Sequence, residues 1–451
     1  MKKFEKLEIV NMNCAGIDVG SKSHFVAIGQ DDSQVKEFGV STPDFTLISQ
    51  YLRLNGITSI AMESTGSYFQ SLFMYLQQEG FEVMLIHGGA IKQVNGRKTD
   101  VVDCKRIQKL YSLGLLNSCF LPSVAVNEAR IIYRHRLNLI EESSRPMNRI
   151  NKTLRMMNIR IDNAISDIGG KTGQSILMAI VKGERDAKKL ASLADPKIKK
   201  SKKELESYLE GMWNENHLFV LKDCYESYQI LRNRIRKCDA QLENTFKLIL
   251  DSQGSEANEQ EIKLEKKQRS RNSLNYNISK ISYELYGVDL MQIECISEAT
   301  LNSLVCEIGR DMSKFETAKH FVSWLRLAPN NKISGGKIIS SRTPRSINKF
   351  TLTLRNAANT IGNLKSGYLN NFFRKIAYKK GRGAAINATA RKMAVIIWKM
   401  ISKKEDYKPI DMHEYKLKQK GKIIQSIKNK IKQLNINPNE LGLDFQLHAI
   451  S

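Results

Sequence analysis

Four acidic residues in the first quarter of the chain have the types and spacing needed to hold metal ions. Asp18 lies in an apolar segment, Glu63 directly follows another, and Asp100 and Asp103 are three residues apart, a spacing that places two side chains on one face of a helix. Clustered carboxylates bind hard cations, and two Mg²⁺ ions about 3.5–4 Å apart stabilise the attacking and leaving oxygens of phosphoryl transfer. The four acids therefore predict a nuclease-like centre that binds two Mg²⁺ ions.

The segments that carry these acids alternate between strand and helix patterns. Strands are expected over residues 14–19, 25–29, 35–40, 58–62 and 82–86, and helices over 44–54, 68–78 and 100–112. Three antiparallel strands followed by helix, strand, helix, strand and helix is the order of the ribonuclease-H-like fold, in which the four acids would converge on one side of the sheet. This predicts an α/β catalytic domain over residues 1–122.

The next part of the chain is predicted to be helical. Apolar side chains between Leu221 and Ile249 recur in alternating steps of three and four, which is the pattern of a coiled-coil seam. We expect helices over 124–165 and 217–252 to pair as an antiparallel hairpin or across a dimer, in a helical coiled-coil region spanning 123–285. The highly charged segments 188–203 and 254–267 are expected to be a connector and a helix tip rather than core.

A mostly α-helical domain is predicted over residues 286–404, followed by a basic helical tail over 405–451. Helices are expected within 285–330 and over 348–361 and 383–401, with a loop rich in Gly, Ser and Arg at 330–346. The fold class is therefore α/β plus α.

The charge of the chain indicates a polyanionic partner. Lys and Arg number 71 against 46 Asp and Glu, a net charge of +25, and residues 317–404 contain nineteen Lys or Arg and no acid. A solvated surface normally mixes charges of both signs, so this stretch predicts contact with nucleic-acid phosphates. The residues expected to make such contacts are Arg97, Lys98, Lys337, Arg342, Arg345, Arg374, Lys375, Lys379, Lys380 and Arg382.

Composition argues against several other classes. The longest apolar run, Met393 to Trp398, is far shorter than the roughly 20 residues of a membrane span, so no membrane partner is expected. The first residues are charged and no apolar segment follows them, unlike a secretory signal, which predicts a cytoplasmic protein. Seven cysteines without a CxxC pair and seven histidines favour neither a disulfide framework nor a zinc site, so any metal should bind to carboxylates.

Several motifs resemble those of the DEDD transposases of the insertion-sequence 110 family, relatives of the pilin-gene invertases. The motifs are Gly16-Ile17-Asp18-Val19, Met62-Glu63-Ser64-Thr65-Gly66, Gly96-Arg97-Lys98-Thr99-Asp100-Val101-Val102-Asp103, Trp324-Leu325-Arg326-Leu327-Ala328-Pro329 and Ser334-Gly335-Gly336-Lys337. The resemblance extends over residues 14–122 and 290–400. It departs from the family pattern at Glu294-Cys295-Ile296-Ser297-Glu298, where the family has a Gly-rich turn, and in a longer helical middle.

The resemblance implies a RuvC-like N-terminal domain, a coiled-coil middle and a C-terminal transposase domain that acts with a structured bridge RNA. This guide RNA would specify both the target and the donor double-stranded DNA. Members of the family form a covalent link between a serine and DNA, and the motif maps that nucleophile to Ser334, with Ser340, Ser341 and Ser346 as neighbouring alternatives. A centre built from both domains would make the protein a homo-oligomer, a dimer or a tetramer.

Three other functions remain open on the sequence. A metal-dependent junction nuclease would use water in place of the serine. An actin-like phosphotransferase would use Asp18-Val19-Gly20-Ser21-Lys22-Ser23 as a phosphate-binding hairpin, although no second Gly-rich nucleotide loop is present. A non-catalytic RNA-binding scaffold would not need the acids at all.

Overall fold

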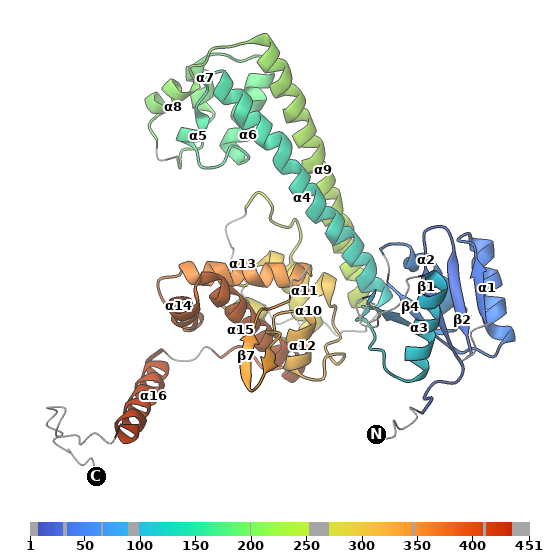
Figure 1. The fold of residues 1–451 in the computed structure, drawn as a ribbon. Coiled ribbons are helices and arrows are strands. Elements are labelled where there is room, and N and C mark those ends of the chain that lie inside the picture. The colour runs from blue at the N-terminus through green and yellow to red at the C-terminus, as the bar shows by residue number, and fades with distance from the viewer. Residues whose placement is uncertain are drawn as a thin grey trace. The chain divides into compact units, whose positions relative to one another are not determined.

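The chain has two compact units, Met1–Leu121 and Pro122–Ser451, each with its own hydrophobic core. The computed structural model describes residues 8–29, 34–64, 66–88, 99–198, 200–251, 270–344, 348–408 and 412–434 (Figure 1). No helix within these ranges is long and apolar enough to cross a membrane.

A mixed five-stranded sheet forms the centre of the first unit. Its strands are β1 (Cys14–Val19), β2 (His24–Ile28), β3 (Val35–Phe38), β4 (Ser59–Glu63) and β5 (Glu82–Ile86). The strand order is β3-β2-β1-β4-β5; β1, β2 and β3 pair antiparallel, whereas β4 is parallel to both β1 and β5. A mixed sheet of this kind followed by many helices is consistent with the predicted ribonuclease-H-like domain.

The helices of this unit are α1 (Thr42–Leu54), α2 (Phe69–Gln78) and α3 (Asp100–Ser112), and they divide between the two faces of the sheet. Ile17 and Met62 belong to the core under α1 and α2, whereas Cys14 and Ala61 pack with Ile107 of α3. Successive side chains of a strand point to opposite faces, so Asp18 and Glu63 lie on the face that α3 covers.

Gly16 allows α3 to lie directly on β1. A Cβ atom at this position would overlap the backbone nitrogen of Gln108 and the carbonyl oxygen of Cys104. Because both obstructing atoms belong to the helix backbone, no rotamer change could make room for a larger residue. The glycine in the Gly16-Ile17-Asp18 motif therefore positions α3, and with it the two aspartates at the start of that helix.

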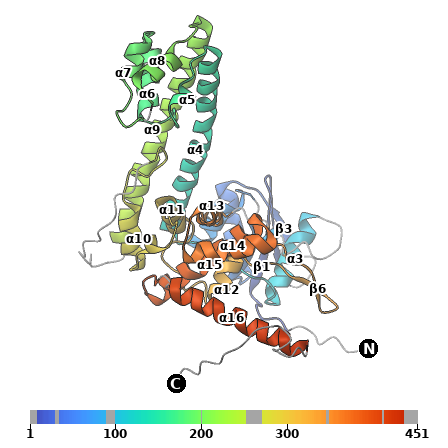
Figure 2. The ribbon, with the colours of Figure 1, turned by 90° about the vertical axis from the view of Figure 1, so that its left-hand side faces the viewer.

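The second unit begins with a long helical hairpin. Helices α4 (Val124–Met156) and α9 (Glu215–Asp251) run side by side in antiparallel directions, as both ribbon views show (Figures 1 and 2). Arg136 of α4 pairs with Asp239 of α9 within one chain. The predicted pairing is confirmed in its intrachain form. Leu231 of the seam is partly exposed, and the other eight seam residues are buried: Leu221, Cys224, Tyr228, Ile235, Cys238, Leu242, Thr245 and Ile249.

The far end of the hairpin carries four short helices that pack on a common core. They are α5 (Ile161–Ala164), α6 (Lys171–Val181), α7 (Ala187–Ser192) and α8 (Lys202–Leu209). The helix expected over 124–165 is too long, because α4 ends at Met156 and Asn158 takes a left-handed φ of 55°. The prediction of a connector over 188–203 is also wrong in part, since Leu190 and Ala191 are buried in this core. Helices of six and eight residues are too short to show a clear apolar period.

A helical bundle follows in the second unit. It consists of α10 (Ile278–Tyr286), a 3₁₀ turn (Leu290–Gln292), α11 (Glu298–Glu307), α12 (Ala318–Trp324), α13 (Lys349–Asn363), α14 (Tyr368–Lys380) and α15 (Arg382–Lys403). Helix α16 (Met412–Gln433) comes after the bundle in the chain. Helices predicted at 348–361 and 383–401 are confirmed as α13 and α15. The sequence analysis missed α14. Glycines stand immediately before and after this helix, at Gly367 and Gly381, and glycines in a sequence favour the prediction of a loop. The expected helix tip at 254–267 lies outside the described residues.

Ion pairs to one buried carboxylate join the helical hairpin to this bundle. The Glu307 carboxylate of α11 accepts hydrogen bonds from Nε and Nη2 of Arg134 at 2.9 and 2.8 Å, and Arg130 Nε lies 3.4 Å from it. The Glu307 side chain is only 2% exposed. A buried carboxylate is costly without a partner, so these contacts hold α4 against α11.

The segment predicted as a loop over 330–346 contains a β-hairpin. Strands β6 (Lys332–Ser334) and β7 (Lys337–Ser340) pair antiparallel across Gly335 and Gly336, whose φ angles are 55° and 73° (Figure 2). Positive φ at both central residues is typical of the type I′ turn that suits a two-residue hairpin. Its strands are short and exposed, so the sequence shows no alternation that would reveal them.

Candidate active site

The four predicted acids come from three elements that meet at one edge of the sheet. Strands β1 and β4 pair in parallel with Ile17 opposite Met62, so the following residues, Asp18 and Glu63, are neighbours. Helix α3 begins at Asp100, where the Thr99 hydroxyl accepts a hydrogen bond from the Val102 amide at 3.3 Å. Both aspartates of α3 lie in its first turn.

The electrostatics of Asp18 reflect this convergence. Burial is the largest influence, and it raises the pKa of the Asp18 carboxyl to about 6, with further contributions from the negative charges of Glu63, Asp100 and Asp103. The three other carboxylates are therefore close enough to disfavour ionisation of Asp18. A bound cation would offset the repulsion between these negatively charged carboxylates.

Two residues that the sequence analysis did not single out shape this cluster. Gly88 follows β5, and a Cβ atom there would overlap the Glu63 carboxylate. Arg106 lies one turn after Asp103 on α3, with Nη1 3.5 Å from its Oδ1. The three-residue spacing of Arg106 from Asp103 could have predicted this ion pair on one face of a helix. Nothing in the sequence indicated that Glu63 would lie against Gly88.

The donor set fits a hard cation such as Mg²⁺. It offers carboxylate oxygens, which Mg²⁺ prefers, and the nearby Cys104 thiol stays protonated because burial raises its pKa to about 12. In the part of the chain that the structure describes, no three acidic, His or Cys side chains are already placed as ligands of one ion. The acids therefore provide the donor atoms that a hard cation needs, without three of them grouped around one position in the described residues.

Ser334 lies in the second unit, at the end of β6. It pairs with Lys337 across the two-glycine turn and is exposed to solvent. Of the alternative serines, Ser340 is half-buried and Ser341 is exposed, while Ser346 lies outside the described residues.

The Trp324–Pro329 motif anchors the hairpin that carries Ser334. Leu325 and Leu327 are buried, and the hydroxyl of Thr351 in α13 donates to the Leu325 carbonyl at 2.9 Å. The Asn330 amide then donates to the Arg342 carbonyl at 3.1 Å, which closes the base of the hairpin. The motif therefore fixes the start of the hairpin to the helical core and leaves its tip free of packing.

The basic residues predicted to contact nucleic acid fall into two groups. Lys337, Arg342, Lys375, Lys379 and Lys380 are exposed, and none forms an ion pair with another described residue. Such side chains are available to phosphates.

Two arginines of the predicted set are instead engaged within the protein. Arg374 Nη2 donates to the Leu364 carbonyl at 3.0 Å. Arg382 Nη2 donates to Asn359 Oδ1 at 2.7 Å and to Asn363 Oδ1 at 2.8 Å. Arg97, Lys98 and Arg345 lie outside the described residues.

Tyr378, which the sequence analysis passed over, lies among the lysines of α14. Its side chain is 92% exposed. Exposed aromatic rings in basic surroundings provide stacking platforms for unpaired bases, and the Tyr378-Lys379-Lys380 run was a signal for this in the sequence.

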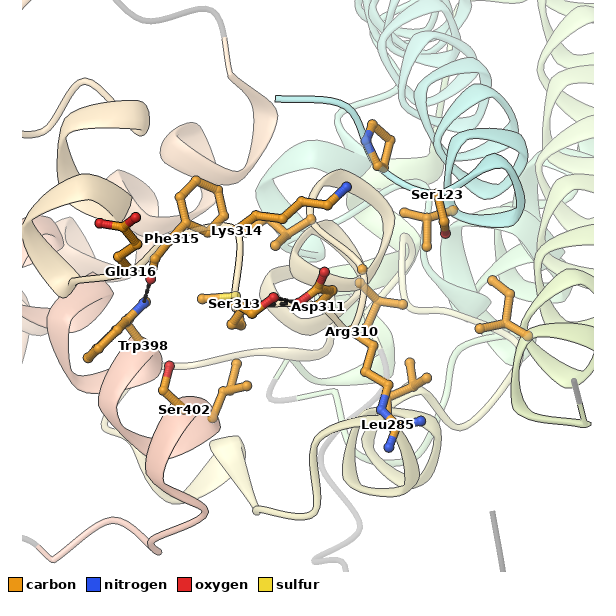
Figure 3. A pocket seen from close by; sticks show the side chains of 18 of the residues that line it. Ser123, Leu285, Arg310, Asp311, Ser313, Lys314, Phe315, Glu316, Trp398 and Ser402 are labelled. Carbon is orange, nitrogen blue, oxygen red and sulfur yellow. Dashed lines mark hydrogen bonds between the residues drawn. The ribbon is translucent and has the colours of Figure 1, made fainter. Parts of the chain in front are cut away.

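A pocket of about 710 Å³ lies elsewhere in the second unit, between Ser123 at the start of α4 and Trp398 of α15 (Figure 3). None of its lining residues belongs to the predicted site. Trp398 Nε1 donates to the Phe315 carbonyl at 3.0 Å, and the Ser313 hydroxyl donates to Asp311 Oδ1 at 2.5 Å. These polar groups hold the loop between α11 and α12 in place, and we assign the pocket no part in the chemistry.

Two family models match the chain. The model for the DEDD transposases of the IS110 type, described as a transposase, matches residues 15–159. The model described as the transposase of the IS116/IS110/IS902 family matches residues 289–361. The first match covers the four acids and the second covers Ser334. No curated protein matches the chain.

Proposed function

Because the chain belongs to the IS110 family of DEDD transposases, we propose that it cleaves and rejoins DNA strands through a covalent link to Ser334. It acts on double-stranded target and donor DNA, guided by a structured RNA, as a dimer or tetramer. The observation that supports this chemistry most directly is the mutual proximity of Asp18, Glu63, Asp100 and Asp103.

The four acids would hold two Mg²⁺ ions against the scissile phosphate. Bound Mg²⁺ supplies positive charge that stabilises the attacking and leaving oxygens. In the protein itself, the register of β1 with β4 orients Asp18 and Glu63, and the Thr99 cap orients the first turn of α3. These contacts hold the ligands near one another before any nucleic acid binds, which limits the reorganisation that catalysis requires.

Ser334 would act as the nucleophile. Its oxygen forms a bond to phosphorus, the bond from phosphorus to the sugar oxygen of the leaving strand breaks, the serine proton passes to solvent, and the leaving oxygen takes up a proton. A hydroxyl of the second DNA strand then attacks the phosphoserine and releases Ser334, so the number of phosphodiester bonds is unchanged. The exposed cations Lys337 and Arg342 lie on the same hairpin segment as Ser334 and would balance the charge that develops on the phosphate.

A denaturing gel of protein and DNA tests this proposal. The purified protein with its co-purified RNA is incubated with Mg²⁺ and duplexes carrying the ends of its insertion sequence. Wild type should form a protein–DNA adduct that survives denaturation and Ser334→Ala should not, whereas the matched variant Ser341→Ala should keep it. The double variant Asp100→Asn/Asp103→Asn should form no adduct.

The alternatives give different results in the same assay. Cleavage that persists in Ser334→Ala without an adduct would identify a nuclease that uses water. Unchanged recombination in Asp100→Asn/Asp103→Asn would identify a non-catalytic scaffold. The actin-like alternative has less support, because the Gly20 amide of the proposed phosphate hairpin donates to the Ser23 carbonyl at 3.1 Å and so is already occupied.

A further inference from the structure

The β6–β7 hairpin exposes isoleucines on the face opposite Ser334. Ile333 and Ile338 lie directly across from each other and are 62% and 61% exposed. Ser334 and Lys337 form the next pair towards the turn, and because strand side chains alternate, this pair faces the other way. Ile339, at a bulge in the pairing, is 70% exposed. The hairpin therefore has one apolar face and one face with a hydroxyl and an ammonium group.

The turn gives this hairpin a narrow leading edge. Gly335 and Gly336 carry no side chains, and a Cβ atom built at either would meet nothing within 4 Å. The body of a two-stranded ribbon is of a size that fits a DNA groove. The turn is therefore narrow, and no other part of the described protein packs against Gly335 or Gly336.

The charges around the isoleucines favour nucleic acid over a protein surface. Lys332, Lys337 and Arg342 surround them, none forms an ion pair within the described ranges, and no acid occurs between Thr317 and Lys404. Duplex DNA offers both phosphates for the cations and flat base surfaces for the apolar side chains. Apolar side chains, isoleucine among them, enter base steps in several DNA-bending proteins.

We propose that the hairpin enters duplex DNA turn first, with Ile333 and Ile338 wedged against an unstacked base beside the phosphate that Ser334 attacks. The two isoleucines are positioning residues: they hold the base stack open while the opposite face of the ribbon presents the serine to the backbone. This inference rests on the proposed role of Ser334.

Fluorescence of 2-aminopurine reports base unstacking without requiring chemistry. The full-length Ser334→Ala protein, with its co-purified RNA, is bound to duplexes that carry the ends of the insertion sequence. In a series of these duplexes, 2-aminopurine is placed at successive positions across the boundary between the insertion sequence and the flanking DNA. We expect a rise in fluorescence at one or two positions. The added changes Ile333→Thr and Ile338→Thr should abolish the rise, because threonine keeps the β-branched shape that suits a strand but lacks the apolar surface.

Two matched variants serve as controls. Ile333→Val/Ile338→Val should retain the fluorescence rise, and Ile230→Thr, at an isoleucine of α9 that is 60% exposed, should not change it. With Ser334 intact, the Thr pair should lower the rate of adduct formation about tenfold or more, which corresponds to about 1.4 kcal/mol.

Three results would overturn the wedge. The rise could persist in the Thr pair, or bound DNA could show no rise at any position. The Thr pair could also dissociate the oligomer in light scattering, which would mean that the isoleucines cover a protein interface. None of these results bears on the difference in adduct formation between wild type and Ser334→Ala, so failure of the wedge is distinguishable from failure of the serine mechanism.

Discussion

The two parts of the proposed chemistry are held in very different ways. The acids are placed by a packed sheet: Ile17 and Met62, which precede Asp18 and Glu63, are fully buried, and a capped helix supplies the other two. Ser334 lies on an exposed hairpin that has no core of its own. We therefore expect the acids proposed to bind metal to be organised before nucleic acid binds, whereas the proposed nucleophile would acquire its surroundings only from bound nucleic acid.

The largest effect is expected for Asp18→Asn. The variant removes a negative charge from the centre of the cluster but keeps its shape, so folding and DNA binding should persist while strand cleavage slows by about a thousandfold, the loss typical of a major electrostatic group. Initial cleavage rates in Mg²⁺ measure this. Glu37→Gln, on an exposed position of β3, is the control and should cleave normally; equal losses in both variants would contradict the cluster.

Gly16→Ala tests whether the sheet positions α3. The added methyl group would overlap backbone atoms of Gln108 and Cys104, and overpacking of this kind costs about 1–3 kcal/mol. Denaturant unfolding should show this loss together with weaker Mg²⁺-dependent cleavage. Gly383→Ala is the matched control, because a Cβ there meets nothing within 4 Å and a helical Gly→Ala change stabilises by up to about 1 kcal/mol. Equal stability of the two variants would argue against the close contact.

Substitutions at Gly335 test whether the conformation of the turn affects adduct formation independently of the global stability of the protein. Valine at a φ of 55° is strained by about 1–2 kcal/mol, so Gly335→Val should reduce adduct formation about tenfold and leave the unfolding midpoint unchanged. Gly335→Asn keeps a type I′ turn and should retain most of the activity. If valine and asparagine behave alike, the turn conformation has no role in catalysis.

The smallest effect concerns the pH dependence of folding stability, and it tests the buried core of the first unit. His24 of β2 is 2% exposed, and burial lowers the pKa of its imidazole despite the nearby Asp44. The unfolded chain protonates this residue near pH 6.5 while the folded state does not, so the unfolded state binds more protons and stability falls as pH drops below about 6.5. His24→Phe should flatten that part of the stability curve, and His135→Phe, at an exposed position of α4, should not.

Parts of the fold with long or repeated patterns were predictable from the sequence. The strands of the first unit alternate or run continuously apolar, and the α9 seam repeats over many turns, so both were located correctly. Short elements were not: β6, β7, α7 and α8 contain too few residues for a period to appear. Cys295 was also not predictable: it takes a left-handed φ of 61°, which residues other than glycine rarely adopt.

The residues proposed to carry the chemistry could be predicted from the sequence alone, because the proposal depends on residue type and the family motifs include them. The sequence also determined the basic character of the C-terminal region. Other features became visible only in the folded protein: Asp18 is influenced by the charges of Glu63 and the α3 aspartates, Glu63 lies against Gly88, and Arg374 and Arg382 form hydrogen bonds within the protein. The reason is physical: these facts depend on which backbones approach each other across the sheet and between helices, and spacing along one chain does not specify such long-range contacts.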